Sequence, residues 1–267
     1  MRKIYLALMC TAGLMMMTAC GGDKKAEEKA AEGENTEEVT NDDEQESEEQ
    51  TAEGEEADAD VWGDPAKAEV LDLIALYESG DFKPGLSDVF VDTLAGETVG
   101  ELPSKWDIHC GSAEIGKALG HNYITMLGGD TELIPLAADG SRVTLPEAYT
   151  LEFEFMLGRD VWFHVNFQDA EEAGCGDFNL WLCHADWNIA KNDEEWINGG
   201  KDELEKLLKK TGWNHFAATY AKGNLKFFIN GKRIANLPNI KPAATFVIRG
   251  DGAEGNTHYI KNIRVAK

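Results

Sequence analysis

Glu152 and Glu154 are the first residues whose type and spacing indicate chemistry. They are two positions apart in an alternating sequence, so we expect both side chains on one face of a strand, ~6.5–7 Å apart. Glycoside hydrolysis uses two carboxyl groups that are separated by about 5–9.5 Å. We interpret the two glutamates as solvent-facing charges of a sheet and keep hydrolysis through them as an alternative.

A second set of residues could bind a sugar. Carbohydrate sites combine a flat aromatic ring, which packs on the apolar face of the sugar, with amide and carboxyl groups that bind its hydroxyls. Such groups lie on the polar faces of two expected strands and in the loop that follows them: Trp162, His164, Asn166, Gln168, Asn179, Trp181 and Trp187. If the two strands are neighbours, these residues form a concave aromatic–amide strip. Otherwise loops cover the tryptophans.

The sequence does not indicate a cofactor. Ca²⁺ prefers six to eight oxygen ligands, and the set Asp251, Glu254 and Asn256 in an acidic turn matches no known calcium loop. We keep it only as a weak calcium alternative. No Cys-x-x-Cys spacing of the kind that indicates structural zinc is present.

The N-terminus reads as an export signal. Arg2 and Lys3 precede an apolar run, residues 4–17, that is too short to span a bilayer. The run ends in Met-Thr-Ala-Cys, which resembles a bacterial lipobox, although Met17 replaces the usual Leu, Val or Ile. The resemblance implies a signal peptide of residues 1–19 and acylation of Cys20, palmitate included, which anchors the protein in a membrane.

Residues 20–60 form an acidic linker that we expect to be disordered, because Val39 is its one large aliphatic residue and it holds no aromatic residue. The whole chain carries a formal charge of −24. No stretch concentrates the Lys and Arg that a phosphate backbone requires, so we expect no nucleic-acid binding. After export, Cys110, Cys175 and Cys183 permit at most one intramolecular disulfide, and their spacing does not select the pair.

Residues 61–86 are expected to hold a short helix, over Pro65–Ser79, because Asp64-Pro65 is a typical helix start. From there the apolar period changes from 3.6 to 2, which is typical of antiparallel sheets with one buried face. The main alternating strands are Thr150–Leu157, Val161–Gln168, Phe178–Leu182, Ala244–Ile248 and Tyr259–Val265, the last with a bulge. Asn230-Gly231 indicates a two-residue hairpin, and Lys201–Lys210 is the one helical pattern among the strands.

The segments Trp213–Tyr220, Lys222–Leu225 and Phe228–Lys232, with Ile260–Val265 near the end, resemble the laminin-G/concanavalin A-like jelly roll. The resemblance covers residues 87–267. This part of the chain is similar to the domain found ahead of outer membrane protein A-like modules in some lipoproteins. It implies an all-β sandwich of two antiparallel sheets, in which His215 is structural rather than catalytic. We expect Trp106 and Trp213 to have packing roles.

This fold hosts lectins, hydrolases and inert spacers. Its glucanases carry an acid-x-acid-x-x-acid run, and no third acid follows Glu154. We therefore expect a lipid-anchored protein of the cell envelope, at the outer membrane, that binds a carbohydrate without catalysis. The alternatives are a glycoside hydrolase that uses Glu152 and Glu154, and a scaffold or adhesin that binds an envelope protein.

Overall fold

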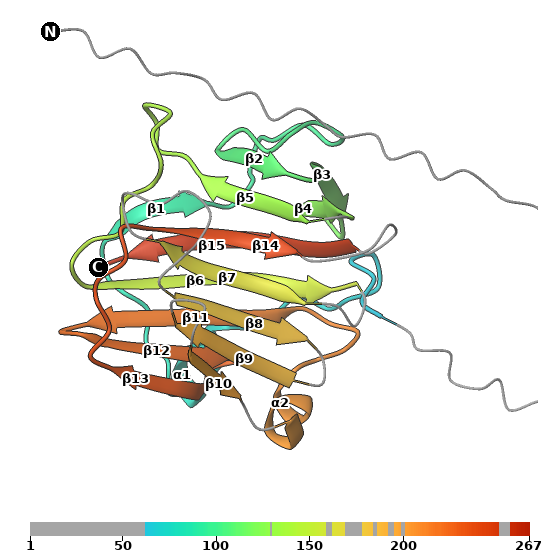
Figure 1. Ribbon diagram of the computed structural model, residues 1–267. Helices are drawn as coiled ribbons and strands as arrows, with labels where there is room; N and C mark the ends of the chain where they lie inside the picture. Colours follow the sequence, from blue (N-terminus) through green and yellow to red (C-terminus); the bar gives the residue numbers. More distant parts are fainter. Residues whose placement is uncertain are drawn as a thin grey trace, which may run out of the picture. The chain divides into compact units, whose positions relative to one another are not determined.

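The computed structural model describes residues 62–128, 130–158, 162–168, 178–183, 186–191, 195–198, 201–250 and 257–267. Within these residues two antiparallel β-sheets face each other (Figure 1), which confirms the all-β jelly-roll sandwich expected from the sequence. None of the helices in this part of the chain has the length and apolar character that crossing a membrane requires.

The larger sheet has eight strands, in the order β13-β12-β11-β6-β15-β4-β3, with β1 paired to the second half of β15. The bounds of its strands are β1 Asp88–Asp92, β3 Ala113–Ala118, β4 His121–Leu127, β6 Tyr149–Leu157, β11 Asn214–Ala221, β12 Asn224–Ile229, β13 Lys232–Pro238 and β15 Thr257–Ala266.

The smaller sheet has seven strands, in the order β10-β9-β8-β7-β14-β5-β2. The bounds of its strands are β2 Trp106–Cys110, β5 Thr131–Pro135, β7 Phe163–Gln168, β8 Phe178–Cys183, β9 Asp186–Lys191, β10 Glu195–Asn198 and β14 Thr245–Gly250.

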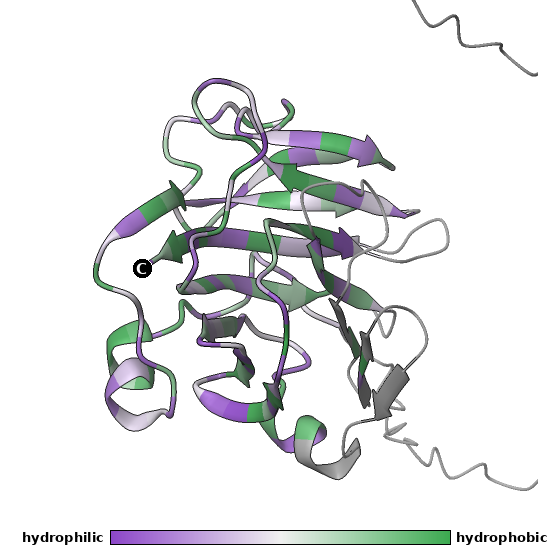
Figure 2. Cartoon of the chain, turned by 60° about the vertical axis from the view of Figure 1, so that its left-hand side comes forward, coloured by the Kyte–Doolittle hydropathy of each residue, from purple (hydrophilic) through white to green (hydrophobic). Residues whose placement is uncertain are grey.

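Apolar residues of the two inner faces form the core. Hydrophobic and hydrophilic residues alternate along several of the coloured strands (Figure 2), as expected where successive side chains point to opposite faces of a sheet. Phe153 stacks on Phe216 with ring centroids 4.7 Å apart, and Phe155 stacks across the sandwich on Phe163 at 5.3 Å. Burial of each such ring stabilises the fold by about 1.5–3 kcal/mol.

Two irregularities expected from the sequence are confirmed. Asn230 and Gly231 connect β12 to β13 with φ angles of 47° and 78°, the positive values that a type I′ turn requires. In β15 the register against β6 shifts between Lys261 and Arg264, and Asn262 adopts a φ of 52° at this bulge.

The helix expected over Pro65–Ser79 is much shorter, because the segment holds two separate caps. Asp64 Oδ1 accepts from the backbone N–H of Ala66, which closes a turn, and Ala68 is then buried on the large sheet. Asp72 starts the helix itself, α1 (Leu73–Ser79), by accepting from the N–H of Ala75.

The second helix, α2, spans Lys201–Leu207 and stops short of the expected Lys210. The side chain of Asn214, at the start of β11, binds both the N–H and the carbonyl of Lys209 at 2.7 and 2.9 Å. These hydrogen bonds turn the chain into the strand, which is why the helix ends there.

Candidate functional site

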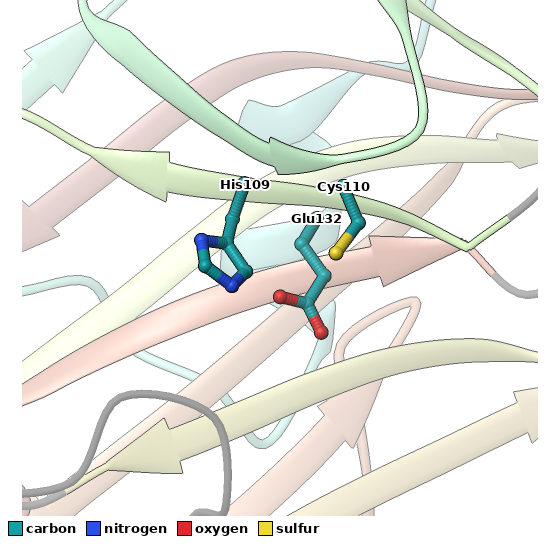
Figure 3. A group of neighbouring side chains, drawn as sticks. All are labelled: His109, Cys110 and Glu132. Carbon is teal, nitrogen blue, oxygen red and sulfur yellow. The ribbon is translucent and has the colours of Figure 1, made fainter. Parts of the chain in front are cut away.

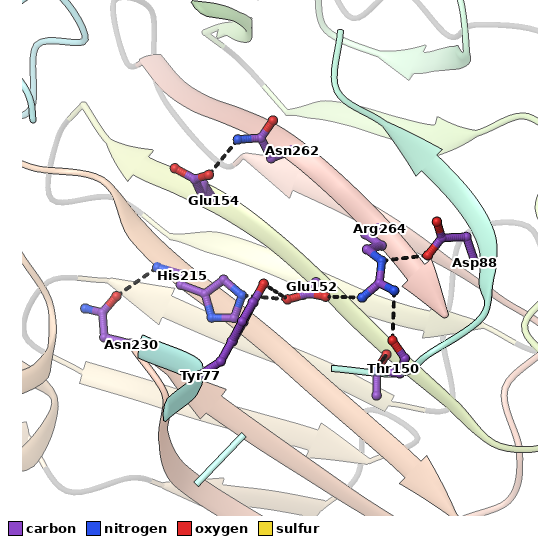
Figure 4. Close-up of polar contacts among 10 residues, drawn as sticks. Tyr77, Asp88, Thr150, Glu152, Glu154, His215, Asn230, Asn262 and Arg264 are labelled. Carbon is purple, nitrogen blue, oxygen red and sulfur yellow. Dashed lines mark hydrogen bonds and ion pairs between the residues drawn. The ribbon is translucent and has the colours of Figure 1, made fainter. Parts of the chain in front are cut away.

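The strongest described polar cluster lies on the outer face of the eight-stranded sheet and centres on Glu152 of β6 (Figure 4). Glu152 Oε2 accepts a hydrogen bond from Tyr77 Oη at 2.7 Å and lies 3.1 Å from His215 Nε2. Its other oxygen accepts from Arg264 Nη1 at 2.9 Å, and Arg264 also binds Asp88 at 2.7 Å. We call these five residues the Glu152 cluster.

Glu154, two residues further along β6 on the same face, has its own partners. Asn262 Nδ2 donates to Glu154 Oε1 at 2.6 Å, and Lys261 Nζ lies 3.3 Å from Oε2. Lys261 in turn lies over the ring of Trp213, 4.0 Å from its centroid. The β15 bulge at Asn262 brings both partners to this carboxylate.

The expectation that Glu152 and Glu154 face solvent is wrong. Both are on the outer face, as alternation predicts, but only 3% and 2% of them is exposed. The segment that carries α1 lies over this part of the sheet: Tyr77 reaches Glu152, and Phe82 packs on His215 and Phe228 at 5.5 Å. The sequence offered no signal for this cover.

The cluster is poorly suited to glycoside hydrolysis. Burial alone would raise the pKa of Glu152, but the hydrogen bonds from His215, Tyr77 and Arg264 outweigh it and hold the pKa below its ordinary value. A general acid for glycoside cleavage needs a raised pKa. The cavity beside both glutamates measures about 150 Å³, below the ~300–1,000 Å³ of typical ligand pockets.

The aromatic–amide strip falls on the outer face of the seven-stranded sheet. Its two strands, β7 and β8, are neighbours, as the strip requires, and the backbone register sets His164 opposite Trp181 and Asn166 opposite Asn179. Residues directly opposite each other share a face of the sheet. Trp187, expected in a loop, lies instead in β9, opposite Leu182 of β8. Leu182 belongs to the core, so this register position is on the inner face, and the expectation that Trp187 belongs to the strip is wrong.

The described part of the strip is less open than expected. Trp162 is half-buried, and His164, Asn166 and Gln168 are buried, although they lie on the polar face. Gln168 Oε1 accepts from Arg142 Nη1 at 3.4 Å. The expectation that these three side chains form an open, concave strip is therefore wrong.

Two buried acceptors on this face lack a hydrogen bond. Asn166 Oδ1 on β7 and Thr245 Oγ1 on the adjacent β14 have no hydrogen-bond partner among the residues that the structure describes. Thr245 is paired in register with Gln168, two residues from Asn166, so both atoms belong to one patch of the sheet. A buried polar atom without a partner costs about 1–3 kcal/mol.

Several expected features lie outside the described residues. These are the calcium alternative at Asp251, Glu254 and Asn256, the acylated Cys20 with the signal and the whole linker, and Cys175. Cys110 is an exposed free thiol at the end of β2. Trp106 and Trp213 are buried in packing roles, as expected.

Comparison with known proteins supports the fold. No protein-family model and no curated protein matches the sequence. One similar structure is from work on the endo-acting O-glycanases with which prominent members of the human gut microbiota initiate mucin breakdown. It is 10% identical, has a TM-score of 0.51, and the match covers 68% of this chain and 99% of that one.

Two further structures are less similar. The carbohydrate-binding module CBM66 of Bacillus subtilis is 10% identical with a TM-score of 0.41, over 61% of this chain and 96% of the module. A chain of botulinum neurotoxin type C, whose cell entry depends on two ganglioside molecules, is 12% identical with a TM-score of 0.45. That match covers 67% of this chain and 47% of the toxin chain.

Proposed function

We propose that this protein is a lipid-anchored component of the cell envelope whose sandwich domain binds a carbohydrate without cleaving it. The observation that carries the proposal is the outer face of β7 and its neighbours. There the register sets an indole position, Trp181, opposite His164, and two amide positions, Asn166 and Asn179, opposite each other.

The chemistry of these groups fits a sugar. Hydroxyl groups of a pyranose donate hydrogen bonds to amide and hydroxyl oxygens, and the C–H face of the ring packs on an indole. The half-buried Trp162, directly before β7, offers a second aromatic surface beside the same strand. The gut O-glycanase structure, which shares the fold, comes from proteins that act on mucin glycans, and this agrees with a glycan ligand.

The hydrogen-bond partners of Glu152 and Glu154 support binding without cleavage. Every oxygen of Glu152 has a donor, its pKa is lowered, and Glu154 is held by Asn262 and Lys261. The lowered pKa of Glu152 is the opposite of what the general acid of glycoside hydrolysis needs. The membrane attachment rests on the sequence around Cys20, with the acidic linker as the spacer between the lipid and the sandwich.

A glycan array with the full-length chain, purified in detergent, tests the proposal. We expect binding to one glycan class and a loss of about two- to tenfold in affinity for Trp181→Ala and for Trp162→Ala, since a stacked ring contributes about 0.5–1.5 kcal/mol. Tyr259→Ala is the matched control, because Tyr259 is a half-buried aromatic residue of the other sheet.

Three outcomes contradict the proposal. The first is silence on every glycan, with capture of a specific envelope protein, which favours the scaffold or adhesin. The second is release of sugar products that Glu152→Gln and Glu154→Gln abolish, which favours a glycoside hydrolase. The third is glycan binding that Trp162→Ala and Trp181→Ala leave unchanged, which moves the ligand away from β7 and β8.

A further inference from the structure

The edge of the seven-stranded sheet carries a cluster of three different metal-ligating side chains (Figure 3). His109 and Cys110 end β2, and Glu132 lies on the paired strand β5. One ligand atom of each, an imidazole nitrogen, the thiol sulfur and a carboxylate oxygen, lies within 4.8 Å of the other two. His109 and Cys110 are exposed, so the cluster opens to solvent.

A β-bulge brings the three side chains to one side of the sheet. In a regular strand consecutive side chains point to opposite faces of the sheet, so His109 and Cys110 could not bind the same metal ion. Here Ile108 pairs with Leu133 while Cys110 pairs with Glu132, which leaves His109 as an extra residue opposite Glu132. Bulges re-aim side chains in this way and recur beside functional sites.

The end of β2 is held in this geometry by its own contacts. Thr131 Oγ1 donates to the carbonyl of Ser112 at 3.1 Å and accepts from its N–H at 3.3 Å. Gly111, directly after Cys110, has a φ of 68°, and a Cβ there would come within 2.4 Å of Thr131 Oγ1. The turn that follows the cluster is therefore fixed to the start of β5.

We propose that His109, Cys110 and Glu132 bind a borderline-soft divalent metal ion, with Zn²⁺ as the best match. Zn²⁺ takes thiolate, imidazole and carboxylate ligands with bonds of about 2.0–2.3 Å, and three protein ligands leave a fourth position for water. Ligand atoms of such a tetrahedron lie roughly 3.3–3.8 Å apart, so small side-chain rotations suffice. Ca²⁺ and Mg²⁺ prefer oxygen ligands, and only Glu132 of the three residues has oxygen ligand atoms in its side chain.

The neighbouring charges fit a divalent cation. Arg249 Nη1 lies 3.4 Å from Glu132 Oε1 and its Nη2 lies 3.3 Å from Asp130, which positions the carboxylate and leaves Oε2 for the metal. Asp130, Glu132 and Arg249 sum to one negative charge. Cys110 adds a second when it releases its thiol proton to solvent and forms the metal–sulfur bond.

Cobalt substitution of the full-length chain, reduced beforehand with a phosphine, tests the site. We expect one equivalent of Co²⁺ to give a thiolate-to-cobalt charge-transfer band that Zn²⁺ removes. Cys110→Ser should abolish the band, and His109→Ala and Glu132→Gln should each weaken binding by about tenfold or more. His121→Ala is the matched control, because His121 is an exposed histidine at the start of β4.

A second measurement separates metal binding from a failure to fold. Zn²⁺ should raise the unfolding temperature of the wild type and of His121→Ala, and should leave that of Cys110→Ser unchanged. The proposal is overturned if the wild type gives no charge-transfer band. It is equally overturned if the band survives in Cys110→Ser, or if His121→Ala weakens binding as much as His109→Ala does.

Discussion

Glu152 is a charge that the fold buries on the outside of a sheet rather than in its core. A buried carboxylate is costly unless each oxygen has a donor, and Tyr77, His215 and Arg264 provide those donors. Removal of one member of such a buried cluster lowers the free energy of unfolding by more than the whole cluster contributes to it, because the remaining buried groups lose their partner. The Glu152 cluster therefore holds the segment 62–86 against the sheet.

Glu152→Gln tests this role. We expect the free energy of unfolding at about pH 7 to fall by about 2–3 kcal/mol, since hydrogen bonds to charged groups contribute about 1.5–3 kcal/mol. The folded pKa of Glu152 lies below the ordinary value of 4.5. Its charge therefore stabilises the fold above about that pH, and this contribution is lost as the pH falls through the folded pKa. Urea denaturation at several pH values measures both effects.

The difference between wild type and Glu152→Gln should shrink as the pH falls below about 4.5. Glu101→Gln, at an exposed position, is the control and should change the free energy of unfolding by less than about 0.5 kcal/mol. A difference between wild type and Glu152→Gln that stays constant with pH would show that the charge of Glu152 does not stabilise the fold.

The sequence allowed the face of each site residue to be predicted but not its exposure. Alternation set Glu152, Glu154 and Met156 on the outer face, and all three lie there. Alternation carries no information on what covers a face, and here α1 and the residues around it do. The His109–Cys110–Glu132 cluster is hidden for a related reason, because a bulge and a second strand assemble it.

At the scale of the elements, strong alternation was predictive and weak alternation was not. Alternation predicted β6, β7, β8, β14 and β15 close to their observed positions, and the family resemblance and the Asn230-Gly231 turn predicted β11 and β12. The strands β2–β5 were not expected, because their outward residues include apolar ones and their alternation is weak. The β3–β4 turn also lacks the usual signal: Leu119 stands with Gly120 at φ angles of 50° and 84°, where Asn-Gly or Asp-Gly is typical.

Gly231→Ala tests the hairpin between β12 and β13. An L-residue in the left-handed region costs roughly 1–2 kcal/mol, and the new Cβ would lie 3.1 Å from Leu76 of α1. We expect the free energy of unfolding to fall by about that amount, measured by urea denaturation. Gly212→Ala, whose Cβ would meet only Lys209 at 3.4 Å, should be nearly neutral. Equal effects of the two substitutions would contradict the turn assignment.

Phe82→Ala tests the docking of the segment that follows α1. Phe82 is fully buried between Tyr77, His215 and Phe228, and truncation of a buried Phe costs about 3–5 kcal/mol. We expect a loss of that size in urea denaturation, with faster hydrogen exchange of the α1 amides. Leu86→Ala, at a position 97% exposed, should change neither. Unchanged α1 exchange in Phe82→Ala would show that this contact does not hold the helix.

At the scale of the whole molecule, the outer faces of the two sheets differ in the groups that they carry. The outer face of the eight-stranded sheet is occupied by α1 and the residues beside it, which bury Met156, Glu152 and Ala217. The proposed sugar-binding residues and the proposed metal ligands belong to strands of the seven-stranded sheet. The binding functions proposed here are thus assigned to this second sheet.

Cys20 decides whether such a ligand would be held at a membrane. Several acyl chains on one cysteine would anchor the chain stably, at about 0.8 kcal/mol per buried CH₂, whereas one chain binds only marginally. In a bacterial host fed labelled palmitate we expect label in the wild type, and an N-terminal peptide that begins at an acylated Cys20. Cys20→Ser should lose the label, and the matched variant Cys10→Ser should keep it, because Cys10 lies in the signal that is removed. Label on Cys20→Ser would mean that the lipid is attached to another residue. A wild-type N-terminus without lipid would mean that the apolar start is an ordinary export signal and that the sandwich is released.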